Sequence, residues 1–161
     1  MSVRLTDEDI SKLIRESKPV PAALKNPGHI KTGGSLLARD FSVVGSEGCK
    51  FRVILRHNPK GLFDFSVILA YLPDEFTQQF RLVRYNGKHR HRNRIEKNRF
   101  FDFHIHRATQ RYQDSGYKED AYAEPTTRYS DIHSAIRCLL KDCGFDVSEP
   151  ECDSLFSEEE L

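Results

Sequence analysis

The sequence predicts a single α+β domain: a five-stranded antiparallel β-meander with an N-terminal helix and a C-terminal helix packed on one face. Five segments rich in β-branched and aromatic residues follow one another between residues 36 and 108, separated by turn-forming stretches. Apolar residues at helical spacing occur before and after this block. A chain of 161 residues has the usual size of one domain, so we expect one core over residues 1–145.

The N-terminal helix is predicted over residues 7–17. Thr6 followed by Asp9 three residues later is typical of a capping box, in which each side chain bonds the other residue's backbone N–H. Ile10, Leu13 and Ile14 recur at helical spacing behind this cap. We therefore expect these three side chains to be buried.

The sheet is predicted to begin after residues 18–34, a connector that holds three prolines and three glycines. Phe51, Val53 and Leu55 alternate with polar residues, which is typical of a strand with one buried face. The five expected strands lie at residues 36–44, 50–57, 63–72, 79–85 and 99–108.

The C-terminal helix is predicted between a cap at Ser130 or Asp131 and a stop at Gly144. Its apolar residues fall at helical spacing and should cover the apolar face of the sheet. Residues 146–161 carry seven acids and no base, and we expect this tail to be disordered.

Several classes of protein are disfavoured by what the sequence lacks. No apolar run is long enough to span a bilayer, so we expect a cytoplasmic protein without a membrane partner. The four cysteines show no C-x-x-C spacing, which favours free thiols over a zinc finger. No phosphate-binding loop, dinucleotide fingerprint or nucleophile elbow occurs, and no cofactor is expected.

Positive charge is concentrated in residues 81–112, which hold ten Lys or Arg against Glu96 and Asp102. A basic surface of this kind favours contact with a phosphate, a nucleotide, RNA or DNA. The residues expected to make that contact are Lys88, Arg90, Arg92, Asn93, Arg94, Arg107 and Arg111.

The same region contains two H-x-H pairs, His89 with His91 and His104 with His106. Alternation along residues 99–108 places Phe101, Phe103 and Ile105 toward the core and both histidines of the second pair on the opposite, solvated face. His91 and Asn93, from the preceding basic loop, can fold back near that face, which would form a pocket of His, Asn and Arg side chains. The sequence does not decide whether the two histidine pairs converge on one site.

Three functions remain open for this pocket. The first is phosphate or nucleic-acid binding, and the second is catalysis by His91, His104 and His106, as a metal-independent nuclease or a metal-dependent hydrolase. The third is a protein-interaction module without a nucleic-acid role, whose basic loop is masked by the acidic tail. No metal ligand is assigned, because the surrounding arginines would repel a cation. The sequence does not decide whether the protein is an enzyme.

The segments His91-Arg92-Asn93 and His104-Ile105-His106, followed by Ala121-Tyr122 and the final helix, resemble uncharacterised bacterial domains found on mobile elements near toxin or defence genes. This resemblance covers residues 80–145 and implies a toxin, antitoxin or phage-interaction role. The chain departs from the pattern in its extra His89 and its more basic loop. The predicted sheet also leaves an edge strand through which a homodimer would form.

Overall fold

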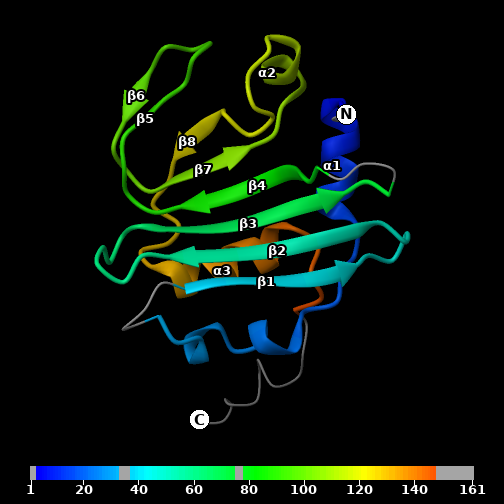
Figure 1. Cartoon of the computed structure of the whole chain (residues 1–161), viewed down its shortest axis with the longest axis vertical. Helices are drawn as coiled ribbons and strands as arrows, with labels where there is room; N and C mark the ends of the chain where they lie inside the picture. The colour runs from blue at the N-terminus through cyan, green and yellow to red at the C-terminus, as the bar shows by residue number, and fades with distance from the viewer. Residues whose placement is uncertain (1–2, 33–36, 75–77, 148–161) are drawn as a thin grey trace.

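The computed structural model describes residues 3–32, 37–74 and 78–147, which form an α+β fold built on one antiparallel sheet. Six strands lie side by side in the order β1-β2-β3-β4-β7-β8 (Figure 1). They are β1 Leu37–Val44, β2 Lys50–His57, β3 Phe65–Leu72, β4 Phe80–Asn86, β7 His104–Arg107 and β8 Ala123–Pro125. The predicted α+β class and antiparallel sheet are confirmed, and the first four strands form a meander.

The sheet differs from the prediction beyond β4. The predicted single strand over 99–108 divides into β6 Arg99–Phe100 and β7. β6 pairs with β5 His91–Arg92 in a separate two-stranded hairpin, while β7 pairs with β4. The sixth strand, β8, escaped prediction because its three residues end at a proline and show no apolar alternation.

Three α-helices are present in the described residues: α1 Asp7–Arg15, α2 Gln110–Asp114 and α3 Ile132–Asp142. The capping box of α1 is confirmed, since the Thr6 hydroxyl accepts from the backbone N–H of Asp9 at 3.0 Å. The Asp131 carboxylate caps α3 in the same way, accepting from the N–H of Ser134 at 2.8 Å. The short α2 was not predicted, because its five residues show no apolar pattern at helical spacing.

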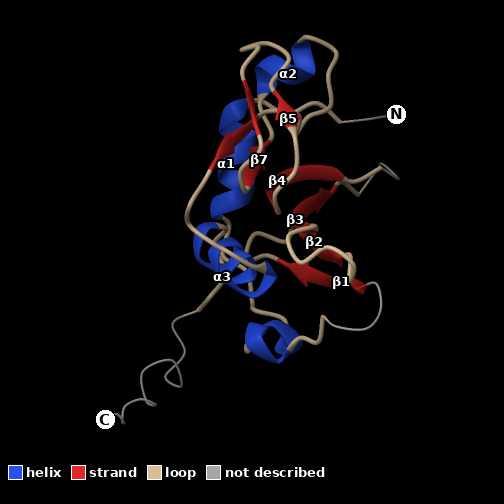
Figure 2. Cartoon of the chain, turned by 90° about the vertical axis from the view of Figure 1, so that its left-hand side faces the viewer, coloured by secondary structure: helices blue, strands red, loops and turns tan. Residues whose placement is uncertain are grey.

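The main core lies between the sheet and the helices. In Figure 2, α1 and α3 lie on the same side of the sheet. Ile10 and Ile14 of α1 are buried, as expected, whereas Leu13 is only partly buried. The hydroxyl of Tyr85 in β4 donates to the Asp142 carboxylate of α3 at 2.7 Å, which marks the helix-facing side of β4. On the other face of the sheet, a second and smaller apolar cluster consists of Ile54, Ile68 and Ala70.

A buried lysine joins the ends of the two long helices. Lys18 is 1% exposed, and its ammonium lies 2.8–2.9 Å from four backbone carbonyls, those of Leu13, Ile14, Glu16 and Cys143. The first three belong to the last turn and C-cap of α1, and the fourth follows α3. One cation therefore satisfies carbonyls at both helix C-termini, where positive charge is favoured.

No helix within the described ranges has the length and the apolar composition that a membrane span requires. The connector 18–34 contains two short 3-10 helices, Ala22–Leu24 and Pro27–His29. Cys49, Cys138 and Cys143 are free thiols, as predicted. Cys152 and most of the acidic tail, residues 148–161, lie outside the described residues, so the expected disorder stays a prediction.

Candidate functional site

The second H-x-H pair lies on the face of β7 that points away from α3. In the β4–β7 register, His104 is opposite Asn86 and His106 is opposite Arg84, whereas Tyr85, which contacts α3, belongs to the other face. The shared face of the two histidines is therefore as predicted. The predicted solvation of this face is wrong, because His104 is 0% and His106 is 4% exposed.

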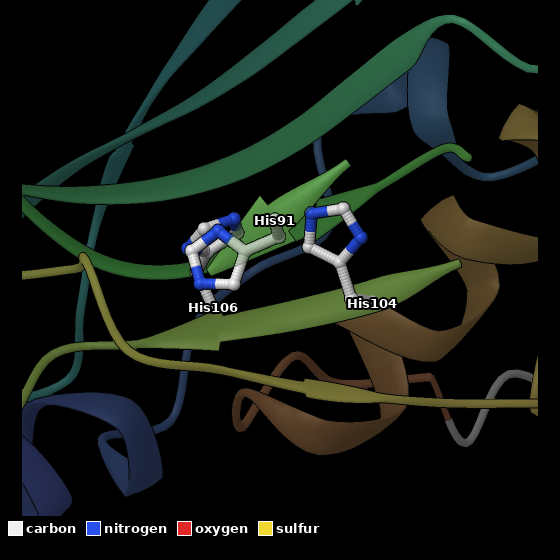
Figure 3. A group of neighbouring side chains, drawn as sticks. All are labelled: His91, His104 and His106. Carbon is white, nitrogen blue, oxygen red and sulfur yellow. The ribbon is translucent and has the colours of Figure 1, made fainter. Parts of the chain in front are cut away.

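The β5–β6 hairpin buries these imidazoles. His91 of β5 is paired with Phe100 of β6, and both side chains point inward. The His91 ring centroid lies 5.4 Å from that of His104 and 4.8 Å from that of His106, and Phe100 lies 5.5 Å from His104. Figure 3 shows the three imidazoles turned toward one another. The loop histidine thus converges on the strand pair, a point that the sequence left open.

Each of the three rings has one nitrogen engaged in a hydrogen bond. Nδ1 of His104 donates to the carbonyl of Asp102, and Nδ1 of His106 donates to the carbonyl of Asp120, both at 2.8 Å. The third ring, that of His91, bonds the amide oxygen of Asn93 through Nε2 at 2.8 Å. An imidazole nitrogen that faces a carbonyl oxygen must carry the proton, so the other nitrogen of each neutral ring has a free lone pair.

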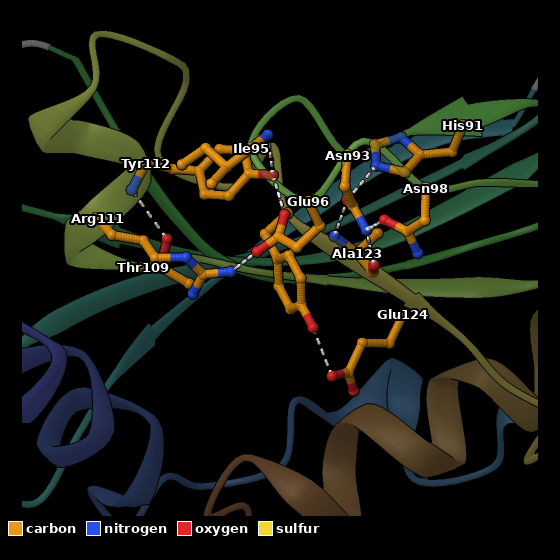
Figure 4. A network of polar contacts seen from close by, with 11 residues as sticks. His91, Asn93, Ile95, Glu96, Asn98, Thr109, Arg111, Tyr112, Ala123 and Glu124 are labelled. Carbon is orange, nitrogen blue, oxygen red and sulfur yellow. Dashed lines mark hydrogen bonds and ion pairs between the residues drawn. The ribbon is translucent and has the colours of Figure 1, made fainter.

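The hairpin is fastened to the sheet through Asn93, which is 1% exposed. Its Oδ1 accepts from the backbone N–H of Ala123 at 2.9 Å, and its Nδ2 donates to the Ala123 carbonyl at 2.8 Å and to Asn98 at 3.0 Å (Figure 4). Asn93 thus pairs with the first residue of β8 as a backbone amide would. Sequence reasoning placed it among the ligand-contacting residues, but its amide is fully used in holding the hairpin and orienting His91.

The turn of the hairpin is held by α2. The N–H of Ile95 donates to the Tyr112 hydroxyl at 3.2 Å, and this hydroxyl donates to the Glu96 carboxylate at 2.5 Å. Arg111 forms an ion pair with the same carboxylate (Figure 4). Its guanidinium also lies 4.9 Å from the centre of the Tyr122 ring. Arg111 is therefore neutralised within the protein instead of standing free for a phosphate.

Burial controls the protonation of the strand pair. Desolvation lowers the pKa of His104 to about 4 and that of His106 to about 2, and the nearby Arg84 charge acts in the same direction. The exposed His89, whose ring lies 4.8 Å from that of His104, also has a lowered pKa, chiefly through desolvation. His104 and His106 are thus neutral at pH 7.

The outer face of the hairpin carries the basic residues. Arg92 is directly opposite Arg99 in the β5–β6 pair, and both are exposed. With Arg90 they line a surface hollow of about 560 Å³, together with His91, Phe100 and the exposed Phe101. Arg99 and the two phenylalanines were not predicted as site residues, and Phe101 was expected in the core. The sequence signal that could have identified this surface is the pair Arg90 and Arg92 before the turn, with Arg99 after it.

Three further predicted contact residues lie apart from this hollow. The exposed Arg94 has its guanidinium 5.9 Å from the Tyr117 ring, and the Lys88 ammonium lies over Phe103 at 5.3 Å. The last, Arg107, alternates with His106 along β7, points to the other face and donates to Ser11 of α1 at 3.2 Å. The structure therefore separates Arg107 from the histidine cluster.

Searches with the whole chain against protein-family models, curated proteins and solved structures each find no match. The resemblance to mobile-element domains and the homodimer through a sheet edge stay predictions. A functional proposal therefore depends on the chemistry of the site.

Proposed function

We propose that the protein binds single-stranded nucleic acid through the outer face of the β5–β6 hairpin. The main support is the cross-strand pair of Arg92 and Arg99, because like charges directly opposite each other destabilise a hairpin. Neither guanidinium has an acidic partner within the described ranges, and Glu96, the one acid in residues 88–99, pairs with Arg111. An unfavourable arrangement of this kind suits a surface whose countercharges come from a bound polyanion.

Aromatic rings beside the arginines favour an unpaired strand as the ligand. Phe101 is 58% exposed and Phe100 is half-buried in the same hollow. Unpaired bases stack on such rings, while guanidinium groups bind the phosphates between them. The hollow lies at the surface of a hairpin whose two strands are two residues long each. A small open surface of this kind suits a flexible single strand that can adapt to it.

Metal-independent catalysis is less well supported by the same geometry. General acid–base hydrolysis needs one imidazole to give a proton to the leaving oxygen. Burial lowers the pKa of His104 to about 4 and that of His106 to about 2, so neither ring is an imidazolium that could give up its second proton at pH 7. Both rings also use Nδ1 to bond the backbone.

Fluorescence anisotropy with labelled oligouridine and oligothymidine tests the proposal between 50 and 200 mM salt. Each phosphate contact on a single strand contributes about −0.7 to the slope of log K against log [salt]. If Arg90, Arg92 and Arg99 each hold one phosphate, the slope is about −2. The Arg92→Ala/Arg99→Ala double variant should reduce that slope by about two-thirds.

Arg107→Ala is the matched control, since Arg107 has the same charge on the opposite face of the sheet. It should leave both affinity and salt slope unchanged. Phe101→Ala should weaken binding at every salt concentration without changing the slope. Equal loss of affinity in the Arg107 variant and in the hairpin variant would contradict the assignment, and tighter binding of duplex than of single strands would contradict the class of ligand.

A further inference from the structure

The histidine cluster lies beneath the hairpin, and its member His91 also lines the hollow on the basic outer side. The hydrogen bonds described above leave one lone-pair nitrogen on each ring: Nδ1 of His91, Nε2 of His104 and Nε2 of His106. One ligand nitrogen from each ring lies within 4.8 Å of the other two. We propose that His91, His104 and His106 bind one divalent transition-metal ion of the zinc type through these three nitrogens.

A buried and unpartnered nitrogen points to a missing ligand. His104 is 0% exposed, and its Nε2 has no hydrogen-bond partner within the residues the structure describes. Leaving a buried polar atom unpaired is costly, and native proteins keep few such atoms. In Figure 3 the ring of His104 faces those of His91 and His106, so a cation among them would satisfy this nitrogen.

The surrounding hydrogen bonds are those of a metal site. Histidines that bind metals usually donate their other ring N–H to a carbonyl or carboxylate, which fixes the tautomer and the direction of the lone pair. His104 and His106 donate to backbone carbonyls, and His91 donates to the Asn93 amide oxygen. All three rings are thereby prepared with the lone pair on the inward nitrogen.

The spacing allows binding after a small contraction. Zinc–nitrogen bonds of about 2.0–2.1 Å in a tetrahedron place the nitrogens about 3.3 Å apart. The largest separation in the cluster is 4.8 Å, so closing by about 1.5 Å is sufficient. His91 is carried by the hairpin, which lets it approach the two histidines of β7 without a change in the sheet.

Repulsion by arginine, the reason for assigning no metal from sequence, is offset in part by the buried Asp120 carboxylate. Arg84, the cross-strand neighbour of His106, donates to the buried Asp120 carboxylate at 3.1 Å, and Arg81 lies 3.4 Å from the same carboxylate. The guanidiniums of Arg92 and Arg99 lie on the outer face of the hairpin.

Three nitrogen ligands favour zinc, cobalt, nickel or copper over magnesium or calcium, which prefer oxygen. Three protein ligands also leave the fourth tetrahedral position to water or another ligand, as in catalytic zinc sites. The proposal does not require nucleic-acid binding, because its ligands are the three imidazoles and not the arginines of the hollow, although His91 borders both.

Metal titration of the full chain, stripped with a chelator and kept reduced, tests the site without any nucleic acid. Zinc should bind with one-to-one stoichiometry in calorimetry and raise the Tm. Cobalt should give the visible absorption bands of a tetrahedral site with nitrogen and oxygen ligands. His91→Ala should weaken zinc by at least tenfold, the loss that even an outer partner of a zinc ligand can cause.

His29→Ala is the matched control, because His29 is exposed on the connector far from the cluster in the chain, and its variant should bind zinc as the wild type does. His91 is half-buried on the hairpin, so its variant should keep the sheet, which far-ultraviolet circular dichroism checks. His104→Gln should abolish the cobalt bands. Unchanged zinc affinity in His91→Ala, or a thiolate-to-cobalt charge-transfer band, would overturn the proposal.

Discussion

Replacing Lys18 with methionine should change how the stability of the protein depends on pH. Burial lowers the pKa of Lys18 from 10.5 to about 8. The unfolded chain, with an ordinary lysine pKa, therefore binds more protons than the folded chain between pH 8 and 10.5. Stability contributed by this group thus rises as the pH rises through that window.

The size of the effect follows from the shift. At pH 7 the buried charge costs the folded state about 3 kcal/mol relative to a lysine with an unperturbed pKa, and at pH 10 the cost is about 1 kcal/mol. The free energy of unfolding of the wild type, minus that of Lys18→Met, should therefore increase by about 2 kcal/mol from pH 7 to 10. Urea unfolding at several pH values measures both curves.

Taking the difference between the two proteins removes the contribution of groups that titrate in this range without interacting with Lys18. The thiol of Cys143 does interact with Lys18, but burial raises its pKa to about 12, so it stays protonated over this range. A difference that stays constant with pH would refute the reasoning and show that the four carbonyls around the ammonium offset its desolvation. If the variant does not fold, a carbon-13 titration of the lysine side chain gives the pKa directly, and a value near 10.5 has the same meaning.

Two further substitutions test the packing that positions the site. Asn93→Ala leaves the buried N–H and carbonyl of Ala123 unpaired, so it should lower the free energy of unfolding in urea by about 2–4 kcal/mol. The control Asn98→Ala should lower it by less than about 1 kcal/mol. Equal losses in the two variants would mean that Asn93 does not fasten the hairpin. Gly144→Ala combines a φ of +78° with a Cβ 2.5 Å from the Glu16 carbonyl, whereas Gly48→Ala has a φ of +87° and no atom within 4 Å. The first should lower stability by at least about 1 kcal/mol more than the second, and a smaller gap would mean that the chain relaxes there.

Local signals explain what the sequence predicted well. The cap of α1 depends on Thr6 and Asp9, three residues apart, and α3 ends before Gly144, whose φ is positive as a helix stop requires. Alternation along β2 identified Phe51, Val53 and Leu55, all of them 0% exposed. Each of these features depends on residues near one another in the chain.

The missed features depend on contacts between distant residues. Phe101 and Phe103 share one alternation pattern, yet the first is 58% and the second 9% exposed, because the chain leaves one strand pair and enters another between them. The solvated face expected for His104 is covered by the hairpin. Asn93 holds that hairpin down through Ala123, thirty residues later, and no local pattern reveals this pairing.

The covering hairpin is an insertion between two neighbouring strands. Asn86 at the end of β4 pairs with His104 at the start of β7, so the sheet is continuous without residues 87–103. The entropy of closing a loop grows slowly, by about 0.6 kcal/mol for each doubling of its length. The length of this segment can therefore change without breaking the sheet. One insert supplies both the third imidazole, which lies against the two of β7, and the arginine pair of the outer surface.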